Sequence, residues 1–392
     1  MAPVIAIVGG GIAGLSAALA FARLDCRVHV FEGSQSLQEV GAGLQLSPNA
    51  TRLIDFLGLS EKLADKMVEP TDLTILSGMT LRMLCRIPSA DFARQNWQAP
   101  YGVIHRADLQ FLLAEAVSGH PNCTLQLGEE ISVGSEISLA THLTRLTDQE
   151  PDLIIGADGV WSSIRDFAPG GSSATFTGSV AWRAVAGKSD FTFIDRRNSV
   201  NAFLAPHTHM VVYPLMRDDA TNVVAVTPGR MTDHSWDSAG NAKHLQNHFS
   251  AWHPDIVAAL GELTWRRWPL FEIRRTCFRA GDKTVLIGDA AHALTPHAAQ
   301  GAAMAIEDAC ALAACFEASN QDIERTIGRF EALRQRRVAR VRRRGDFNKF
   351  TYHARGPVRF GRDLVLTMRA PEKLAHDLDW LYGHDASTLS PG

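Results

Sequence analysis

Apolar runs, glycine-rich turns and helical patterns alternate through the first part of the chain. Residues 4–8 form a short β-rich apolar run, and the Ala- and Leu-rich stretch 12–24 that follows predicts a helix. A second strand is predicted over 28–31. Similar apolar runs predict two further buried strands, one that ends near Asp158 and one over 284–287. Strands that alternate with helices in this way favour a parallel sheet covered by helices.

The pattern changes between residues 177 and 275. Alternating apolar runs such as 180–185, 209–213 and 222–226 are separated by turn residues, which predicts an antiparallel sheet. The predicted fold class is therefore α/β, with a Rossmann-like unit, a second domain built on an antiparallel β-sheet, and C-terminal helices. Within 100–175 we expect βα units and a β meander, although 127–150 lacks the Asp-Gly hairpin expected there.

The first glycine-rich turn has the spacing of a dinucleotide site. Gly9-x-Gly11-x-x-Gly14 joins the first strand to the first helix, so Gly9 permits the tight turn, Gly11 admits a pyrophosphate and Gly14 allows close packing. Helix amides near Ile12 and Ala13 would face the phosphates. Glu32, at the end of the second strand, would accept hydrogen bonds from ribose hydroxyls and repel a 2′-phosphate. This motif does not distinguish FAD from NAD.

A second glycine-rich turn follows the predicted strand at 284–287, and it favours FAD over NAD as the bound dinucleotide. Gly288-Asp289 lies at a strand's carboxyl end, where Asp289 would accept hydrogen bonds from ribityl hydroxyls. Pro296 is followed by small residues, including Gly301 and Ala302, that let the backbone lie against a flat ring. A helix beginning near Gly301 would direct its amides at the flavin pyrimidine.

A third motif, Asp158-Gly-x-x-Ser-x-x-Arg165, lies between the two glycine-rich turns. With these three motifs in this order, the chain resembles the class A flavoprotein aromatic hydroxylases over residues 1 to about 385. The branch with the greatest likeness is that of salicylate hydroxylase, 3-hydroxybenzoate 6-hydroxylase and 6-hydroxynicotinate 3-monooxygenase. The shared segments include one that contains Gly43 and one that contains Arg106. The resemblance implies that Arg106 pairs with FAD phosphate or ribityl oxygens.

The resemblance implies a monooxygenase with bound FAD and NADH or NADPH as a transient co-substrate. O2 would react at the reduced flavin to give a C4a-hydroperoxide, which hydroxylates a small aromatic or heteroaromatic acid. The alternative substrate is larger, a quinone precursor or a polycyclic compound. We predict a discontinuous FAD-binding domain (1–70, 100–175 and 281–345), a substrate domain (71–99 and 176–280) and a C-terminal helical segment (346–392).

Ring hydroxylation by an electrophilic oxygen requires an electron-rich phenolate, so a base near neutral pH is expected. His209 and Tyr213 share one face of a predicted strand. His297 lies in the second glycine-rich turn, residues 288–301, called the flavin loop below. All three match polar positions of the hydroxynicotinate branch. We predict His209 as the base, His297 as an alternate base and Tyr213 as an orienting group. Other predicted substrate contacts are Gln45, Arg183 and Gln300, although Gln45 replaces a histidine of that branch. His292 is expected to be structural.

Composition narrows the remaining classes. A net charge of −3 argues against a nucleic-acid surface, and the longest apolar run is too short for a membrane span. Six cysteines without a C-x-x-C pair give no metal prediction and favour reduced thiols in the cytoplasm. The arginine-rich stretch 334–344 is interpreted as a solvated helix rather than an anionic-ligand patch. A helix this basic is also compatible with a subunit partner, so a homodimer is one expectation.

Overall fold

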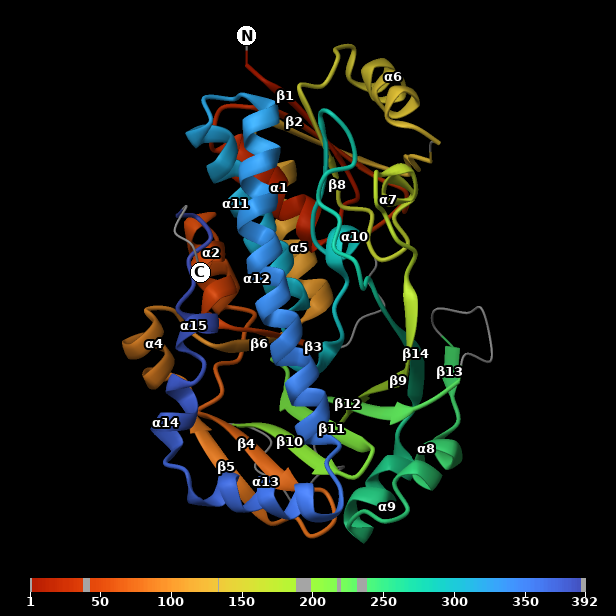
Figure 1. Cartoon of the computed structure of the whole chain (residues 1–392), viewed down its shortest axis with the longest axis vertical. Coiled ribbons are helices and arrows are strands. Elements are labelled where there is room, and N and C mark those ends of the chain that lie inside the picture. Colours follow the sequence, from red (N-terminus) through yellow and green to blue (C-terminus); the bar gives the residue numbers. More distant parts are fainter. Residues whose placement is uncertain are drawn as a thin grey trace.

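A parallel sheet of five strands forms one layer of the molecule (Figure 1). The computed structural model describes residues 2–37, 43–132, 134–187, 199–216, 220–230 and 238–388. Every residue of the central strand is buried, as expected for a parallel sheet covered on both faces. The strand order is β15 (Thr284–Leu286), β8 (Leu153–Gly156), β1 (Val4–Val8), β2 (Arg27–Glu32) and β7 (Cys123–Leu127).

Helices from distant parts of the chain pack together beside this sheet. α1 (Ile12–Ala22) contacts both α5 (Arg106–Ser118) and α11 (Gly301–Ala318), and α11 in turn contacts α2 (Pro48–Phe56) and α12 (Ile323–Tyr352). Residues near both ends of the chain thus build one core around the first strand. The short helices α3 (Ser60–Ala64) and α7 (Ser163–Phe167) complete this region.

A larger sheet of eight strands forms the second layer. Its order is β13 (Ser238–Gly240), β14 (Trp265–Glu272), β9 (Thr175–Ala186), β12 (Thr221–Pro228), β11 (Thr208–Pro214), β10 (Ser199–Ala205), β4 (Asp72–Ser77) and β5 (Met83–Pro88). All neighbours are antiparallel except β10 and β4, which are parallel. The antiparallel prediction is therefore right for the contiguous stretch and wrong at the junction, because β4 enters this sheet from an earlier part of the chain.

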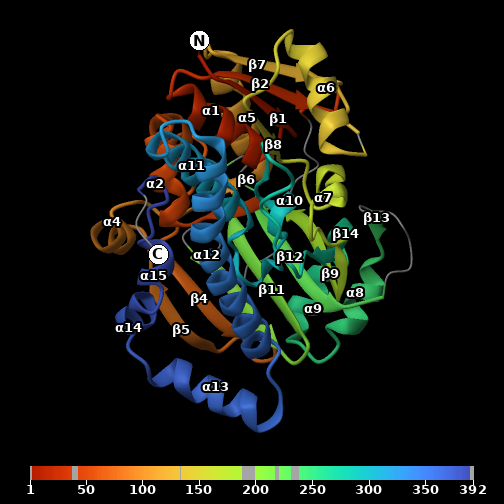
Figure 2. The same ribbon diagram turned by 45° about the horizontal axis from the view of Figure 1, so that its top comes forward.

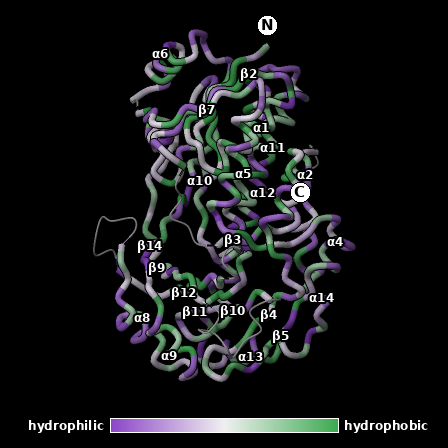
Figure 3. The backbone as a smooth tube through the Cα atoms, turned by 180° about the vertical axis from the view of Figure 1, so that it is seen from behind, coloured by the Kyte–Doolittle hydropathy of each residue, from purple (hydrophilic) through white to green (hydrophobic). Residues whose placement is uncertain are grey.

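Strand alternation gives the larger sheet two different faces. On β11 and β12, Met210, Val212, Val223 and Ala225 belong to an apolar cluster with α8 (Ala242–His248) and α9 (Pro254–Glu262). The residues between them face the opposite way, toward the first layer. Figure 3 shows hydrophobic green along much of both sheets and more purple on α6 and α8. The sequence did not reveal α8 and α9 within the predicted substrate domain.

The β meander predicted between residues 100 and 175 is wrong for the described residues of that range. β7 is followed by a helix, α6 (Glu136–Thr147), before the chain returns to β8. Ser135 caps this helix in a capping box with Ser138, and Leu139 and Leu143, one turn apart, are buried. These local signals form a helix in the segment where the expected Asp-Gly hairpin was missing from the sequence.

The remaining elements connect the two layers. β3 (Gly43–Leu46) and β6 (Gly102–His105) form a two-stranded ribbon, and α4 (Asp91–Trp97) follows β5. α10 (Asp289–His292) and a 3-10 turn, η2 (Pro296–Ala298), lie between β15 and α11. α12 runs along the molecule from the first layer toward the second, where α13 (Gly356–Met368) and α14 (Pro371–His376) contact β5 (Figures 1 and 2). α15 (Asp379–Tyr382) returns to α2.

Two further sequence predictions concern the cysteines and the possibility of a membrane span. All six cysteines are free thiols, in agreement with the absence of cysteine pairs in the sequence. Among the described helices, none combines the length and the apolar character that a bilayer crossing requires.

Candidate active site

Two cavities meet between the layers and share Gly11, Ala157 and Gly159 in their linings. One, of about 440 Å³, lies beside the ends of β1 and β2 and includes Glu32 and Asp158. The other, of about 300 Å³, lies between the first layer and the larger sheet. Together they form one elongated site, which passes from the first glycine-rich turn to the larger sheet.

The first glycine-rich turn has room on one side only. A Cβ on Gly14 would lie 2.0 Å from the Gly9 carbonyl oxygen, and a Cβ on Gly9 would lie 2.3 Å from that of Ala157. At Gly11 a Cβ would meet no protein atom within 4 Å, because this residue faces the cavities. Gly9 and Gly14 therefore close the strand–helix packing, whereas Gly11 leaves space for a ligand.

Glu32 is held at the end of β2, the position for which the sequence predicted ribose recognition. Its carboxylate accepts hydrogen bonds from the backbone N–H groups of Gly10, at 2.7 Å, and Ser34, at 2.9 Å. The same carboxylate lines the larger cavity, and Asp158 lines it from the neighbouring strand end. Burial raises the pKa of Asp158, although hydrogen bonds from Ser162 and nearby amides oppose that shift.

The second glycine-rich turn forms one wall of the 300 Å³ cavity. Asp289, Pro296, Gly301 and Ala302 line it, together with Ile12 and Ala13 at the start of α1. α11 begins at Gly301, as the sequence predicted. The turn is tied to the third motif, because Arg165 is buried and donates a hydrogen bond of 2.8 Å to the Ala290 carbonyl.

The larger sheet covers the cavity with alternate residues of three strands. His209, Val211 and Tyr213 of β11 line it, as do Val224 and Val226 of β12 and Arg183 of β9. The strand register pairs His209 with Val226, and both Val211 and Arg183 with Val224. His209 and Tyr213 therefore share the face that the even spacing predicted. The Arg183 guanidinium lies 5.0 Å from the Trp268 ring centroid.

The β3–β6 ribbon and the start of α5 complete the lining with Gly43, Gln45 and Arg106. The Gln45 side-chain oxygen accepts a hydrogen bond of 2.6 Å from the Tyr101 hydroxyl, which fixes the amide. The Gly43 N–H donates to the Asn222 side chain at 2.7 Å. A Cβ on Gly43 would lie 2.6 Å from the Tyr213 ring, so this glycine lets ribbon and sheet approach closely.

Three histidines from distant segments meet beside the cavity. The His209 ring centroid lies 5.3 Å from that of His297 and 5.0 Å from that of His353, and His209 Nδ1 lies 2.8 Å from His353 Nε2. One ring nitrogen of each lies within 4.8 Å of the others, a group that could hold a metal ion. Of the three, only His209 is among the described residues that line the cavity.

The histidine cluster favours neutral imidazoles. Burial, together with the neighbouring His297 and His353, holds the pKa of His209 well below its usual range. Burial and the charges of His353 and Lys349 lower the pKa of His297 to about 3. Sequence reasoning missed His353, because it follows the arginine-rich helix and no motif marks it.

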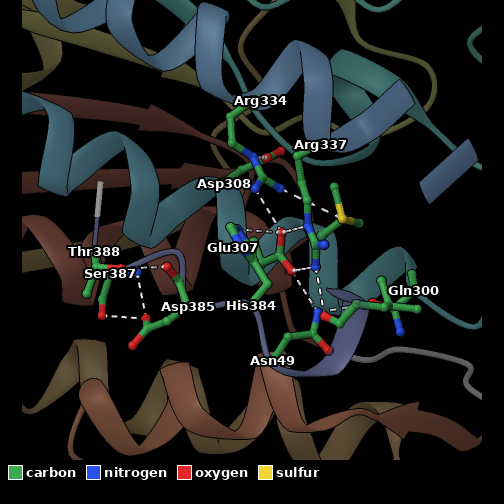
Figure 4. A network of polar contacts seen from close by, with 12 residues as sticks. Asn49, Gln300, Glu307, Asp308, Arg334, Arg337, His384, Asp385, Ser387 and Thr388 are labelled. Atoms are coloured by element: carbon green, nitrogen blue, oxygen red, sulfur yellow. Dashed lines mark hydrogen bonds and ion pairs between the residues drawn. The ribbon is translucent and has the colours of Figure 1, made fainter. Parts of the chain in front are cut away.

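Gln300 has other partners than the predicted substrate. Its side chain donates to the Ser47 hydroxyl at 2.8 Å and accepts from Asn49 at 3.1 Å (Figure 4). Asn49 also donates to Glu307 at 2.7 Å, so Gln300 extends a buried network. The placement does not support the predicted contact between the Gln300 side chain and substrate.

The arginine-rich helix is not simply a solvated one, which corrects the sequence interpretation. Arg334 and Arg337 of α12 are buried and form ion pairs with Glu307 of α11 at 2.8 and 2.7 Å (Figure 4). Arg334 also pairs with Asp308 at 2.6 Å. These pairs join α12 to the helix that begins at the flavin loop. The sequence carried a signal for them in the acidic pair Glu307-Asp308 within an otherwise apolar helix.

Asp308 connects this network to the second glycine-rich turn. One carboxylate oxygen accepts hydrogen bonds from the Gly288 N–H, at 2.8 Å, and pairs with His292 Nε2, at 2.6 Å. His292 is buried and bound to Asp308, which is compatible with the predicted structural role. Burial raises the pKa of Asp308, but His292 and Arg334 lower it further, so the carboxylate stays ionised.

The residues present fit an extended dinucleotide with a flat ring. Gly11 opens to both cavities where a pyrophosphate would cross, and Glu32 lies at the far end. Small residues of the flavin loop face the substrate sheet across a space of about 300 Å³.

Comparisons with known proteins agree with this geometry. The model of the FAD binding domain family matches residues 1–344. The chain is 31% identical to 3-hydroxybenzoate 6-hydroxylase of Polaromonas naphthalenivorans, over 97% of this chain and 95% of that protein. It is 32% identical to 6-hydroxynicotinate 3-monooxygenase of Bordetella bronchiseptica, over 87% of this chain and 90% of that protein. A solved salicylate hydroxylase substrate complex superposes with a TM-score of 0.80 at 20% identity, over 99% and 97% of the two chains.

Proposed function

This chain belongs to the FAD binding domain family and is an FAD-dependent aromatic hydroxylase; from that premise we propose that its substrate is a small aromatic or heteroaromatic acid bearing a ring hydroxyl. NADH or NADPH and O2 would be its co-substrates. The relatives whose names specify hydroxybenzoate and hydroxynicotinate support this substrate class. Among the described residues that line the two cavities, the arginines are Arg106 and Arg183, which form no cluster for a 2′-phosphate, and this favours NADH.

The single observation that carries the proposal is the mixed lining of the 300 Å³ cavity. One wall is the flavin loop, and the opposite wall carries an imidazole, a phenol and a guanidinium, from His209, Tyr213 and Arg183. A cavity of this volume that also receives a flavin ring favours a single-ring substrate over a polycyclic one.

FAD, once reduced and exposed to O2, supplies the electrophilic oxygen for ring hydroxylation. The chain supplies binding, orientation and proton transfer. Arg183 is placed to attract the substrate carboxylate, and the Gln45 amide N–H2 remains available as a donor because Tyr101 occupies its oxygen. Val211, Val224 and Val226 provide an apolar surface against the ring.

His209 is the proposed base. It lies in the lining and, being neutral, has a lone pair with which to accept the ring hydroxyl proton. The resulting phenolate is richer in electrons and is attacked more readily. Burial raises the pKa of Tyr213, so its neutral hydroxyl orients the substrate by hydrogen bonding. His297 contacts His209 and is the alternate base.

A screen with product analysis tests this proposal. Purified holoenzyme is supplied with NADH or NADPH and a panel of hydroxybenzoates and hydroxypyridinecarboxylates, with a quinone precursor and a polycyclic phenol beside them. Coupled NAD(P)H oxidation and a hydroxylated single-ring product are the expected result. A compound that accelerates oxidation but yields only hydrogen peroxide is an effector. Hydroxylation of the larger compounds alone would establish the alternative substrate class.

A further inference from the structure

His353 lies outside the cavity but contacts its proposed base. It follows the last residue of α12, and its ring packs against that of His209 with an interplanar angle of 40°. Nδ1 of His209 lies 2.8 Å from Nε2 of His353, a hydrogen-bond distance. Because Nδ1 is engaged in this way, Nε2 is the nitrogen of His209 that remains for a ligand in the cavity.

The pair has a tautomer suited to proton transfer. If His209 Nδ1–H donates to His353 Nε2, then His209 Nε2 carries a lone pair. When Nε2 accepts a proton from a substrate hydroxyl, the Nδ1 proton passes to His353 Nε2. His353 then releases its own Nδ1 proton, so each ring returns to neutrality and one proton leaves the cavity.

The surroundings of His209 do not stabilise its protonated form. The residue is 4% exposed, its ring contacts His297 and Tyr352 as well as His353, and none of these is an anion that could stabilise an imidazolium. An isolated buried cation is costly, so a base at this position requires a second group to take the proton onward.

His353 is placed to pass the proton outward. Its side chain is half-buried, Lys349 and His207 act on it electrostatically, and the His297 ring packs edge-on against it at 5.8 Å between centroids. His207 lies in the β10–β11 turn, 3.5 Å from the Arg355 guanidinium. Burial, together with Lys349 and His207, lowers the pKa of His353 to about 4, so it does not retain the proton it receives.

We propose that His353 is a positioning residue that holds His209 in its basic tautomer and conducts the substrate hydroxyl proton from the cavity toward solvent. This inference rests on the proposed function, since it assumes a substrate that ionises when bound.

The cluster could instead hold a metal ion, but two observations favour proton transfer. The His209–His353 contact is already a hydrogen bond. Neither ring nitrogen of His297 has a hydrogen-bond partner in the part of the chain that the structure describes. A metal-ligating histidine almost always donates its second ring N–H to an acceptor.

The test measures proton release directly. Oxidised holoenzyme with bound 3-hydroxybenzoate or 6-hydroxynicotinate is subjected to a pH jump, and ring ionisation is followed by absorbance in a stopped-flow instrument. We expect His353→Ala and His353→Gln to slow ionisation at least about tenfold, with the hydroxylation rate falling in parallel. FAD content, ligand affinity and the rate of flavin reduction by NADH are expected to stay unchanged. Added imidazole is expected to restore part of the rate in His353→Ala, because this site is half-exposed.

His142→Gln, a change of a half-exposed histidine on α6, is the matched control and is expected to ionise ligand at the wild-type rate. Wild-type ionisation rates in both His353 variants would overturn the inference. So would joint loss of FAD and ligand affinity, which indicates a structural role, or a stoichiometric metal that the variants lack. Failure of every ring acid to be hydroxylated by the wild type would contradict the proposed function instead.

Discussion

At the scale of single residues, the site depends on which side chains face the cavity and on which neighbours contact them. His209, Tyr213 and Arg183 face the cavity because strand alternation turns Met210 and Val212 toward the opposite apolar cluster. That alternation is readable from sequence. The partners that modify these residues are not, because they come from segments far along the chain, as His297 and His353 do beside His209.

Replacement of His209 by glutamine is expected to separate binding from chemistry. Glutamine fills similar space but cannot accept a proton at neutral pH, so hydroxylation should fall about 100-fold. FAD content and the rate of flavin reduction should stay near wild type, since His209 lies on the substrate sheet. Rapid-reaction kinetics with a hydroxylated ring acid measures both. An unchanged hydroxylation rate would assign the base to another residue.

Two glycines of the first turn are expected to respond differently to alanine. In Gly11→Ala the methyl group enters the cavity and meets no protein atom within 4 Å, so the apoprotein should keep its melting temperature while FAD affinity falls. In Gly14→Ala the methyl group would lie 2.0 Å from the Gly9 carbonyl oxygen, so the apoprotein itself should be destabilised. Flavin absorbance and thermal unfolding of the apoproteins distinguish these outcomes. Equal melting temperatures for both variants would contradict the packing argument.

At the scale of elements, the sequence predicted best where pattern and motif coincide. The strands at 4–8 and 284–287 and the helix from Gly301 lie where their apolar runs and glycines predict them. α6 was missed because a β meander was expected there, although 127–150 lacks the Asp-Gly hairpin of such a meander and carries the capping residues of a helix. The buried side of α12 was missed because Arg334 and Arg337 appear in sequence among exposed arginines.

The ion pairs between α11 and α12 are expected to contribute strongly to stability. Arg334→Ala leaves Glu307 and Asp308 short of a buried partner, which should cost about 3–5 kcal/mol of unfolding free energy. Arg336→Ala, on the exposed side of the same helix, should change it by less than about 0.5 kcal/mol. Urea unfolding of the two variants measures the difference. A similar small loss in both would mean that the buried pairs add little.

At the scale of the whole molecule, the site lies between two sheets, and neither sheet contains it alone. The predicted fold class anticipated both layers, yet the sequence could not show how α12 connects them. This helix pairs with Glu307 beside the flavin loop and ends next to His353 beside the substrate sheet (Figures 1 and 4). Long-range contacts of this kind depend on packing, which no local pattern encodes.

Acid is expected to unfold the protein through this network. Burial raises the pKa of Glu307, but Arg337 and Arg334 lower it further, so its folded pKa lies below the usual range. A depressed folded pKa gives stability that is fully present above the unfolded pKa of about 4.3 and is lost as the pH falls below it. Denaturant midpoints at fixed flavin saturation should therefore decline from about pH 5 to pH 3. In Glu307→Gln that decline should be shallower, and an identical slope would exclude this carboxylate as a cause.

The cavity lining includes residues from Gly11 to Gln45, near the start of the chain, and from Asp289 to Ala305, about three quarters of the way along it. During translation, a ribosome must therefore deliver about three quarters of the polypeptide before the isoalloxazine can be enclosed. Until then the emerging strands of the first layer lack their edge strand and the helix from Gly301 that packs on α1. Cofactor capture is consequently a late event in biosynthesis, and nascent chains that are released early cannot acquire the yellow colour of the finished enzyme.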